Sequence, residues 1–503
     1  MKKKINVLIG VTLFSVSVLS GCSGGGSSEE TDGQALSEDK PYPLTLVVNQ
    51  VGEIPAKGNE IEQAIMKYTN TQLEIQWIPT SAYDEKINVM IASGELPKLM
   101  KLGYNPTTIA SLKSDLFWEI GPYLKDYKNL SAQNPQFYNN INVQGKIYGI
   151  PLFRELGRST LHYRKDWFDS LGLKPMKTLD DWYNNIKALV KNDPDKNGKD
   201  DTYGILLDKK YNQEAFSTFT RISVSQGGPN KWQVDAEGNF TPDFMTEPYY
   251  NVMKLFKRLY EEKLINQDFP VVDSTEMDKL YDSGRAGFRY SGGSAQSWHD
   301  KIIKVIPGAV IDVAPVEGPD GRRLPGENGN AGFLAIPKAT VKTEAEMKRV
   351  LKFIDQLMDP EMATLLVKGV EGKHWKDAGD FTEVIDRDAE AKEVKPYRDT
   401  LPQRGEQYNI AKPSKQPELF RKGSQIGKEN EQYIVTNPAL NLDSTMYYER
   451  GKELEVQITD AQTKFIMGQI DEEGWKKAVD QWKKAGGEQI MKEYKEAYLN
   501  GKK

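Results

Sequence analysis

One short segment near the middle of the chain carries the clearest signal for chemistry. Residues 193–201 read DPDKNGKDD, with glycine at position 6 and oxygen-bearing side chains at positions 1, 3, 5 and 9: Asp193, Asp195, Asn197 and Asp201. Calcium takes six to eight oxygen ligands, and short side chains on alternate residues of a tight loop converge on one ion. Lys199, at position 7, would add its backbone carbonyl. The spacing predicts a structural calcium site.

The same segment also fits a simpler interpretation. An EF-hand loop ends with a bidentate glutamate at position 12, but here that position is Gly204, and residues 203–206 read as a strand. Asp, Asn and Gly are also the usual residues of solvated turns. The segment is therefore either a helix–loop–strand calcium site without the glutamate or an acidic turn.

Signals for catalysis are absent. The chain has three histidines, none at metal-ligand spacing from another: His162, His299 and His374. The sequence contains no P-loop, dinucleotide-binding glycine loop, nucleophile elbow or HExxH pattern. The 72 acidic residues leave a glycosidase carboxylate pair open, but no context singles one out. We therefore expect no enzymatic activity.

The single cysteine, Cys22, stands at the end of an export signal. Three lysines, residues 2–4, precede an apolar stretch over residues 5–18 that is too short for a comfortable membrane span. The sequence LSGC that ends at Cys22 resembles the lipobox of bacterial lipoproteins, in which the signal is cut before the cysteine and the thiol is lipidated. An ordinary secretory signal that happens to contain a cysteine is the alternative.

The lipoprotein interpretation divides the N-terminal region in two. Residues 1–21 are the signal peptide, and residues 22–40 are the lipidated cysteine and a Gly/Ser/Glu-rich flexible tether. Two or three acyl chains give stable anchoring, and no later stretch approaches the roughly eighteen apolar residues of a membrane span. We expect the protein on the extracellular face of the membrane of a Gram-positive bacterium, held there by lipid.

Length and composition indicate a globular protein of two domains. The chain has 503 residues, of which 38% are hydrophobic and 28% charged, and this length exceeds the usual size of one domain. The formal net charge is −5, and removal of the three leader lysines makes it about −8. Nucleic acids and anionic lipids are bound through basic surfaces, so the acidic balance argues against both as partners.

Apolar patterning predicts an α/β protein. Residues 44–49 and 72–77 read as strands around a helix over residues 59–68, which implies a parallel strand pair. Thr178 and Asp181 form a capping-box pattern at the start of another helix. A further helix is expected after Thr246, a short apolar run at residues 332–336, and a helical tail from residue 444 with breaks at glycines: Gly468, Gly474 and Gly486.

Five segments, in order, resemble one protein family. SGELP at residues 93–97 is similar to its ASG-D/E-LPD segment, although Lys98 stands where Asp is usual. Further matches are GKIYGIP at residues 145–151, YRKDW with the following Thr178 at residues 163–178, the acidic loop at residues 193–201, and EGKHW at residues 371–375. The chain resembles extracellular solute-binding lipoproteins of carbohydrate ABC importers, family 1, in the long calcium-loop branch similar to alginate-oligosaccharide binders.

This resemblance implies a two-lobed periplasmic-binding-protein-like fold with the ligand in a cleft between the lobes. Residues 41–155 would form lobe 1, with about 305–370 returning to it, and residues 156–304 would form lobe 2, with about 371–503 returning to it. It further implies a monomer that closes by a hinge on its ligand and docks on ABC permease subunits.

Candidate ligand contacts lie in the motif turns. Sugars suit aromatic platforms and planar hydrogen-bonding groups, which makes Trp298, Trp375 and Tyr148 candidates for stacking. Each tryptophan could instead belong to a core or a lobe surface. Arg154, Glu155 and Arg289 are candidate polar contacts, although Arg154 and Glu155 could equally be a structural pair.

The expected function is capture of an oligosaccharide outside the cell and its delivery to an ABC transporter. The same architecture could bind a peptide or a uronate-bearing fragment instead, because Arg154, Arg158 and Arg289 would suit carboxylates. A surface enzyme that processes glycans is the third possibility.

Overall fold

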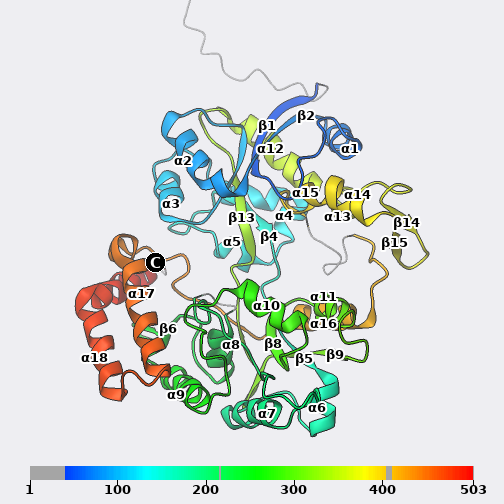
Figure 1. The fold of residues 1–503 in the computed structure, drawn as a ribbon. Coiled ribbons are helices and arrows are strands. Elements are labelled where there is room, and N and C mark those ends of the chain that lie inside the picture. The colour runs from blue at the N-terminus through cyan, green and yellow to red at the C-terminus, as the bar shows by residue number, and fades with distance from the viewer. Residues whose placement is uncertain (1–39, 214–216, 404–410, 502–503) are drawn as a thin grey trace, which may run out of the picture. The chain divides into compact units, whose positions relative to one another are not determined.

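The computed structural model describes residues 40–213, 217–403 and 411–501. Residues 39–503 form one compact unit. The predicted signal peptide, the lipidation site Cys22 and nearly all of the tether lie outside the described residues. The chain is a mixed α/β protein with a five-stranded and a three-stranded sheet, each wrapped by helices (Figure 1).

The five-stranded sheet begins with the predicted strand–helix–strand unit. β1 (Tyr42–Asn49), α1 (Glu60–Thr69) and β2 (Thr71–Ile78) follow in order, and the two strands pair in parallel. The sheet order is β2-β1-β3-β13-β4, with β3 (Leu99–Leu102), β4 (Gly149–Phe153) and β13 (Asn330–Ala335). β3 is parallel to β1, whereas β13 is antiparallel to β3 and β4.

Both faces of this sheet are buried. Leu44, Leu46 and Val48 of β1 belong to one core cluster, while Val47 belongs to the cluster on the opposite face, as the alternation of strand side chains requires. The first face is covered by α1 and α12 (Glu344–Leu357), and the second by α2 (Tyr83–Ser93) and α3 (Pro106–Lys113). We call this sheet and its helices the first lobe. Its remaining named elements are α4 (Lys128–Ser131), α5 (Pro135–Asn139), α13 (Pro360–Lys368), β14 (Trp375–Asp377), β15 (Thr382–Val384), α14 (Arg387–Ala389) and α15 (Lys395–Arg398).

The three-stranded sheet is antiparallel in the order β8-β5-β9. Its strands are β5 (Ser159–Arg164), β8 (Phe288–Gly292) and β9 (Ile311–Pro315). A large core joins it to the surrounding helices, and we call this part the second lobe. Its helices are α6 (Lys165–Leu171), α7 (Leu179–Lys191), α8 (Thr218–Ser225), α9 (Glu247–Glu261), α10 (Ser274–Asp282), α11 (Gln296–Ile302), α16 (Glu418–Asn430), α17 (Thr445–Ile466), α18 (Glu472–Trp482) and α19 (Glu488–Gly501).

Short two-stranded ribbons complete the structure. They are formed by β6 (Trp232–Val234) with β7 (Phe240–Pro242), β10 (Glu317–Gly318) with β11 (Gly321–Arg322), and β12 (Leu324–Pro325) with β16 (Ile434–Val435).

Local signals set most of the predicted helix ends, with one error. The Thr178–Asp181 capping box is formed at the start of α7, and α9 begins directly after Thr246. In the tail, Gly468 lies between α17 and α18 with a positive φ angle, and Gly486 interrupts the helix before α19 with non-helical backbone angles. The expected break at Gly474 is wrong, because this glycine lies in the first turn of α18, where its N–H donates to the capping side chain of Asp471 over 2.9 Å.

The chain passes between the lobes later than the expected return points. β9, at residues 311–315, still belongs to the second sheet, so the return to the first lobe follows Pro315 rather than residue 305. Val394, Tyr397 and Leu401 are buried in the core of the first lobe. The final return to the second lobe therefore comes after residue 401, not near 371.

Candidate functional site

Three strand ends meet at the edge of the first sheet where β4 leaves for the second lobe and β13 arrives from it. Because β1 and β3 are parallel and β13 is antiparallel to β3, the carboxyl ends of β1 and β3 lie beside the start of β13. Ligands of open α/β sheets bind at such carboxyl ends. Asn49 ends β1, Lys101 is the next-to-last residue of β3, and Gly332 lies near the start of β13. We call this edge the ligand edge.

At the ligand edge, the side chain of Lys101 has a strongly shifted pKa. Its ammonium donates a hydrogen bond to Asn49 Oδ1 over 2.5 Å. The pKa of Lys101 is lowered to about 8, first by burial and then by the positive charge of Arg154, while Asp84 acts in the opposite direction. A half-buried ammonium beside a second cation is poorly compensated. The site therefore favours a group that brings negative charge or oxygen lone pairs.

Arg154 and Glu155 stand where β4 leaves the first lobe. The side chain of Arg154 is exposed and that of Glu155 is half-buried. Burial raises the pKa of the Glu155 carboxyl; Arg158 opposes this effect, and Glu431 and Glu327 add to it. The strongest charged neighbour of Glu155 is thus Arg158 rather than Arg154, so the structure gives no support to an Arg154–Glu155 pair.

Arg289, a predicted ligand contact, already has interaction partners within the second lobe. Its guanidinium lies 2.9 Å from Asp278 Oδ1 of α10 and 4.6 Å from the centre of the Tyr281 ring. A ligand would have to compete with this ion pair.

Arg221 of α8 is a buried cation that its own sequence does not single out. Its Nε donates to Ser159 Oγ over 2.9 Å, and burial lowers its pKa to about 10. Nothing in the helical sequence TFTRISVS distinguishes this arginine from a solvated one, because its environment is set by the distant strand β5.

Two of the three predicted aromatic platforms are core residues. Trp298 is 4% exposed and its Nε1–H donates to the Tyr281 carbonyl over 3.0 Å. Its ring meets the Tyr281 ring edge-on, with centroids 5.8 Å apart. Tyr148 is 8% exposed and packs in the cluster on one face of the first sheet. A stacking platform needs an open ring face, so neither residue is placed to act as one.

Trp375 is half-buried in β14 and borders a cavity of the first lobe with a volume of about 410 Å³. Its Nε1–H donates to the Gly369 carbonyl over 2.9 Å. Polar groups of the same cavity include Lys368, Thr382 and Ser414. The neighbouring His374 is buried, accepts a hydrogen bond from the Val370 N–H and contacts Glu393, which is the role of a turn histidine.

The acidic loop at residues 193–201 is organised by bonds among its own residues. The Gly198 N–H donates to Asp193 Oδ2 over 2.9 Å. The Asn197 side-chain amide donates to Asp195 Oδ2 over 2.8 Å and to Asp201 Oδ1 over 3.0 Å. Oxygen atoms from positions 3 and 9 thus converge on one point, which the NH₂ group of Asn197 occupies.

The electrostatics of this loop show crowded carboxylates. A hydrogen bond from Asp195 lowers the pKa of Asp193, while burial and Asp193 itself raise the pKa of Asp195. A nearby cation would relieve the repulsion between two neighbouring carboxylates. Across residues 40–213, 217–403 and 411–501, however, no group of three or more His, Cys, Asp or Glu side chains is arranged to hold a metal ion. The expected ligand set is therefore not preformed.

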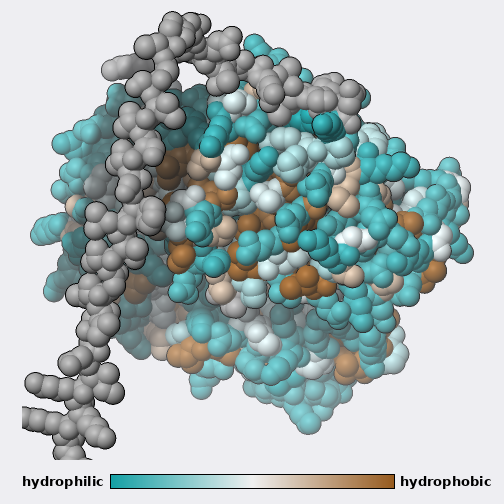
Figure 2. Space-filling view, turned by 90° about the horizontal axis from the view of Figure 1, so that it is seen from above, coloured by the Kyte–Doolittle hydropathy of each residue, from teal (hydrophilic) through white to brown (hydrophobic). Residues whose placement is uncertain are grey.

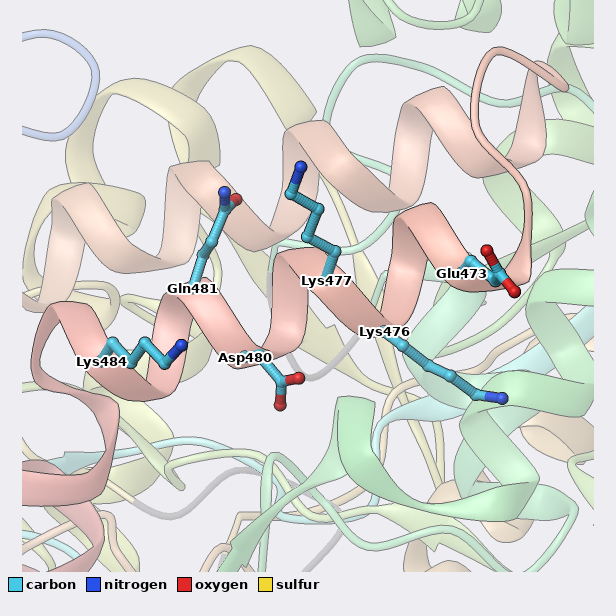
Figure 3. A pocket seen from close by; sticks show the side chains of 6 residues that line it. All are labelled: Glu473, Lys476, Lys477, Asp480, Gln481 and Lys484. Carbon is cyan, nitrogen blue, oxygen red and sulfur yellow. The ribbon is translucent and has the colours of Figure 1, made fainter.

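A surface hollow along α18 is a solvated helix face rather than a ligand site. Figure 3 shows its six side chains projecting from α18 and the turn that follows it in different directions, with no convergence on a common point: Glu473, Lys476, Lys477, Asp480, Gln481 and Lys484. On the face drawn in Figure 2, the described surface is mostly hydrophilic, with apolar residues in small groups. In the part of the chain that the structure describes, no helix is long and apolar enough to cross a membrane.

The chain is similar to known proteins along most of its length. The model of the family described as bacterial extracellular solute-binding protein matches residues 53–364. Lipoprotein LipO of Bacillus subtilis (strain 168) is 36% identical over 496 residues, which cover 96% of this chain and 97% of that protein. The polygalacturonan/rhamnogalacturonan-binding protein YtcQ of the same organism is 35% identical over 517 aligned positions, which cover 100% of this chain and 100% of that protein.

A solved structure supports the fold. The alginate-binding protein AlgQ2, in a crystal structure without calcium ion, superposes with a TM-score of 0.65, covering 92% of this chain and 98% of that chain at 17% identity. The two-lobed periplasmic-binding-protein-like fold is confirmed by this likeness together with the family match. The chain thus belongs to the family of bacterial extracellular solute-binding proteins.

Proposed function

We propose that this protein is a lipid-anchored binding protein that captures an oligosaccharide outside the cell and presents it to the permease subunits of an ABC importer. The full-length match to a relative named as a polygalacturonan/rhamnogalacturonan-binding protein carries this proposal. The relative named as a lipoprotein supports anchoring at Cys22. Catalytic turnover is not part of the proposal, and the protein acts as a monomer on the outer face of a Gram-positive membrane.

The ligand edge favours an acidic oligosaccharide over a neutral one. Lys101 and Arg154 place two positive charges near each other, and a half-buried ammonium binds a carboxylate more strongly than a hydroxyl group. Uronate residues would supply such carboxylates. This agrees with the named ligand of the Bacillus relative, polygalacturonan.

A thermal-shift screen of the Ser23–Lys503 fragment tests this proposal. The fragment contains the whole compact unit. The panel holds oligogalacturonates, rhamnogalacturonan fragments, neutral oligosaccharides and peptides. A ligand at 100 times its dissociation constant adds about 2.7 kcal/mol of stability, which raises the melting temperature. We expect oligogalacturonates to give the largest shift and to be recovered unchanged.

Other outcomes separate the alternatives. A shift with peptides alone would overturn the saccharide class, and consumption of the sugar would show an enzyme. Lys101→Gln should reduce the shift for oligogalacturonates. Lys191→Gln, a change of the same type at an exposed position of α7, is the matched control and should leave the shift unchanged.

We also propose that the acidic loop binds calcium and that the ion has a structural role. Asp193, Asp195 and Asp201 would supply carboxylate oxygens, and Lys199 its backbone carbonyl. Asn197 would rotate its side chain to present Oδ1 in place of the NH₂ group that now bonds Asp195 and Asp201. An amide rotation of this kind exchanges a donor for an acceptor at no cost in shape.

A further inference from the structure

Two of the segments that connect the lobes run side by side as one ribbon. Residues 154–158 join β4 to β5, and residues 316–329 join β9 to β13. The Arg154 N–H donates to the Gly329 carbonyl over 2.9 Å, and the Glu327 N–H donates to the Leu156 carbonyl over 3.0 Å. These bonds continue the antiparallel pairing of β4 with β13 toward the second lobe (Figure 1). We call this pair of segments the crossing ribbon.

Two buried asparagines of the second lobe hold the far end of the crossing ribbon. Asn430, the last residue of α16, donates from Nδ2 to the carbonyls of Gly157 and Ser159 over 2.9 and 2.7 Å. Asn230, which follows α8, donates from Nδ2 to Gly326 O over 3.0 Å and to Val435 O over 2.9 Å. Each side chain thus uses both protons of its NH₂ group on backbone carbonyls.

These contacts are close and shielded from solvent. Asn430 is 0% and Asn230 1% exposed. A Cβ added at Gly157 would lie 2.7 Å from Asn430 Cβ and 2.9 Å from the Asn430 carbonyl carbon, which leaves no room for a side chain. Buried amide hydrogen bonds of this kind are expensive to break, since water cannot replace the lost partner. The second-lobe end of the ribbon is therefore fixed to α16 and to the loop after α8.

The other end of the crossing ribbon has the features of a flexible joint. The β4–β13 register shifts between Asn330 and Phe333, which marks a β-bulge, and bulges bend a strand and interrupt its ladder. Gly329 and Gly332 have positive φ angles of 72° and 100°. The joint lies directly at the ligand edge, because a Cβ added at Gly332 would be 2.9 Å from Lys101 Cε.

We propose that Asn230 and Asn430 are positioning residues that clamp the crossing ribbon to the second lobe, so that the lobes move relative to each other by bending at the bulge of residues 329–332. With the clamp intact, the ribbon and the second lobe move together as one rigid body. Without it, the second-lobe end of the ribbon is released as well, and the angle between the lobes is no longer restricted to one joint.

Interlobe distance distributions test the clamp without any ligand. The Ser23–Lys503 fragment has no cysteine, because Cys22 is the single one of the chain. Spin labels attached after Lys86→Cys on α2 and Lys191→Cys on α7 then report one distance between the lobes by double electron–electron resonance; both positions are exposed. We expect Asn430→Ala and Asn230→Ala each to broaden this distribution toward longer and shorter distances.

Asn266→Ala is the matched control. Asn266 is 5% exposed and bonds Leu207 through both ends of its amide, Nδ2 to the carbonyl and Oδ1 from the N–H, each over 2.9 Å. Its loss should lower the melting temperature as much as the clamp substitutions do while leaving the interlobe distribution unchanged. Equal distributions in all three variants and the parent would overturn the proposal.

Hydrogen exchange of the unmodified fragment gives a second test that needs no substitution. The N–H groups of Gly326 and Glu327, bonded to Val435 and Leu156, should exchange slowly, and that of Ala331 in the bulge much faster. Fast exchange at Gly326 and Glu327 would place the flexible point inside the supposed clamp and would contradict the inference.

Discussion

The lowered pKa of Lys101 predicts how binding of an acidic oligosaccharide depends on pH. In the free protein this pKa is about 8. A bound carboxylate stabilises the ammonium, so the pKa in the complex returns toward or above the usual value of about 10.4. Below pH 7 the ammonium is charged in both states, and the affinity should not change with pH. Above pH 8 binding must include uptake of a proton, and the affinity should fall.

The size of the effect follows from the pKa difference. Between pH 7 and pH 9 the charged fraction of free Lys101 falls by about tenfold, so the dissociation constant for trigalacturonate should rise by about tenfold. Loss of fold does not explain such a change. A lysine with a lowered folded-state pKa binds fewer protons folded than unfolded over the same window, so its contribution to stability rises with pH.

Isothermal titration calorimetry at pH 6, 7, 8 and 9 measures this dependence, and buffers of different ionisation enthalpy measure the proton uptake directly. Lys101→Met should bind more weakly at pH 7 and show a flat profile up to pH 9. A neutral oligosaccharide that binds is the control and should show no proton uptake. An equally steep profile in Lys101→Met would refute the reasoning, since another group would then be responsible.

Three further predictions concern the rest of the structure. Trp298→Ala should lower the free energy of unfolding by about 3–5 kcal/mol, because it removes a buried ring, while the dissociation constant measured well below the melting temperature stays the same; a large loss of affinity in a folded variant would restore its predicted stacking role. Chelation of calcium should lower the melting temperature of the parent but not of the double variant Asp195→Asn/Asp201→Asn. Equal melting curves of the parent with and without chelator would show that the loop is an acidic turn without a structural calcium ion. Asp443→Asn should lower stability by about 1–2 kcal/mol, since Asp443 accepts from Lys113 over 2.7 Å and from Gln144 over 3.0 Å, and denaturant unfolding that matches the parent would contradict this.

Elements governed by neighbouring residues could be predicted from the sequence. The β1–α1–β2 unit and the capping box of Thr178 and Asp181 depend on alternation, period and caps within about ten residues. The error at Gly474 has a local cause as well: a glycine tolerated in the first turn reads like a helix break unless the cap at Asp471 is recognised.

Features governed by distant segments could not be predicted. The pKa of Lys101 depends on its burial in the fold and then on Arg154, fifty-three positions later, and its strand β3 has only four residues. Trp298 follows a Gly/Ser loop and so resembled a surface aromatic, yet it packs against α10. Residues 371–401 belong to the first lobe because Val394 and Tyr397 are buried in its core. Their local sequence does not reveal which of the two cores they join.

A crystal structure of the Ser23–Lys503 fragment with bound trigalacturonate tests the central claim most directly. The account predicts the sugar at the ligand edge between the lobes, unhydrolysed, with a carboxylate bonded to the ammonium of Lys101 and near Arg154. A sugar bound elsewhere, or one that turns only hydroxyl groups toward Lys101, would contradict it.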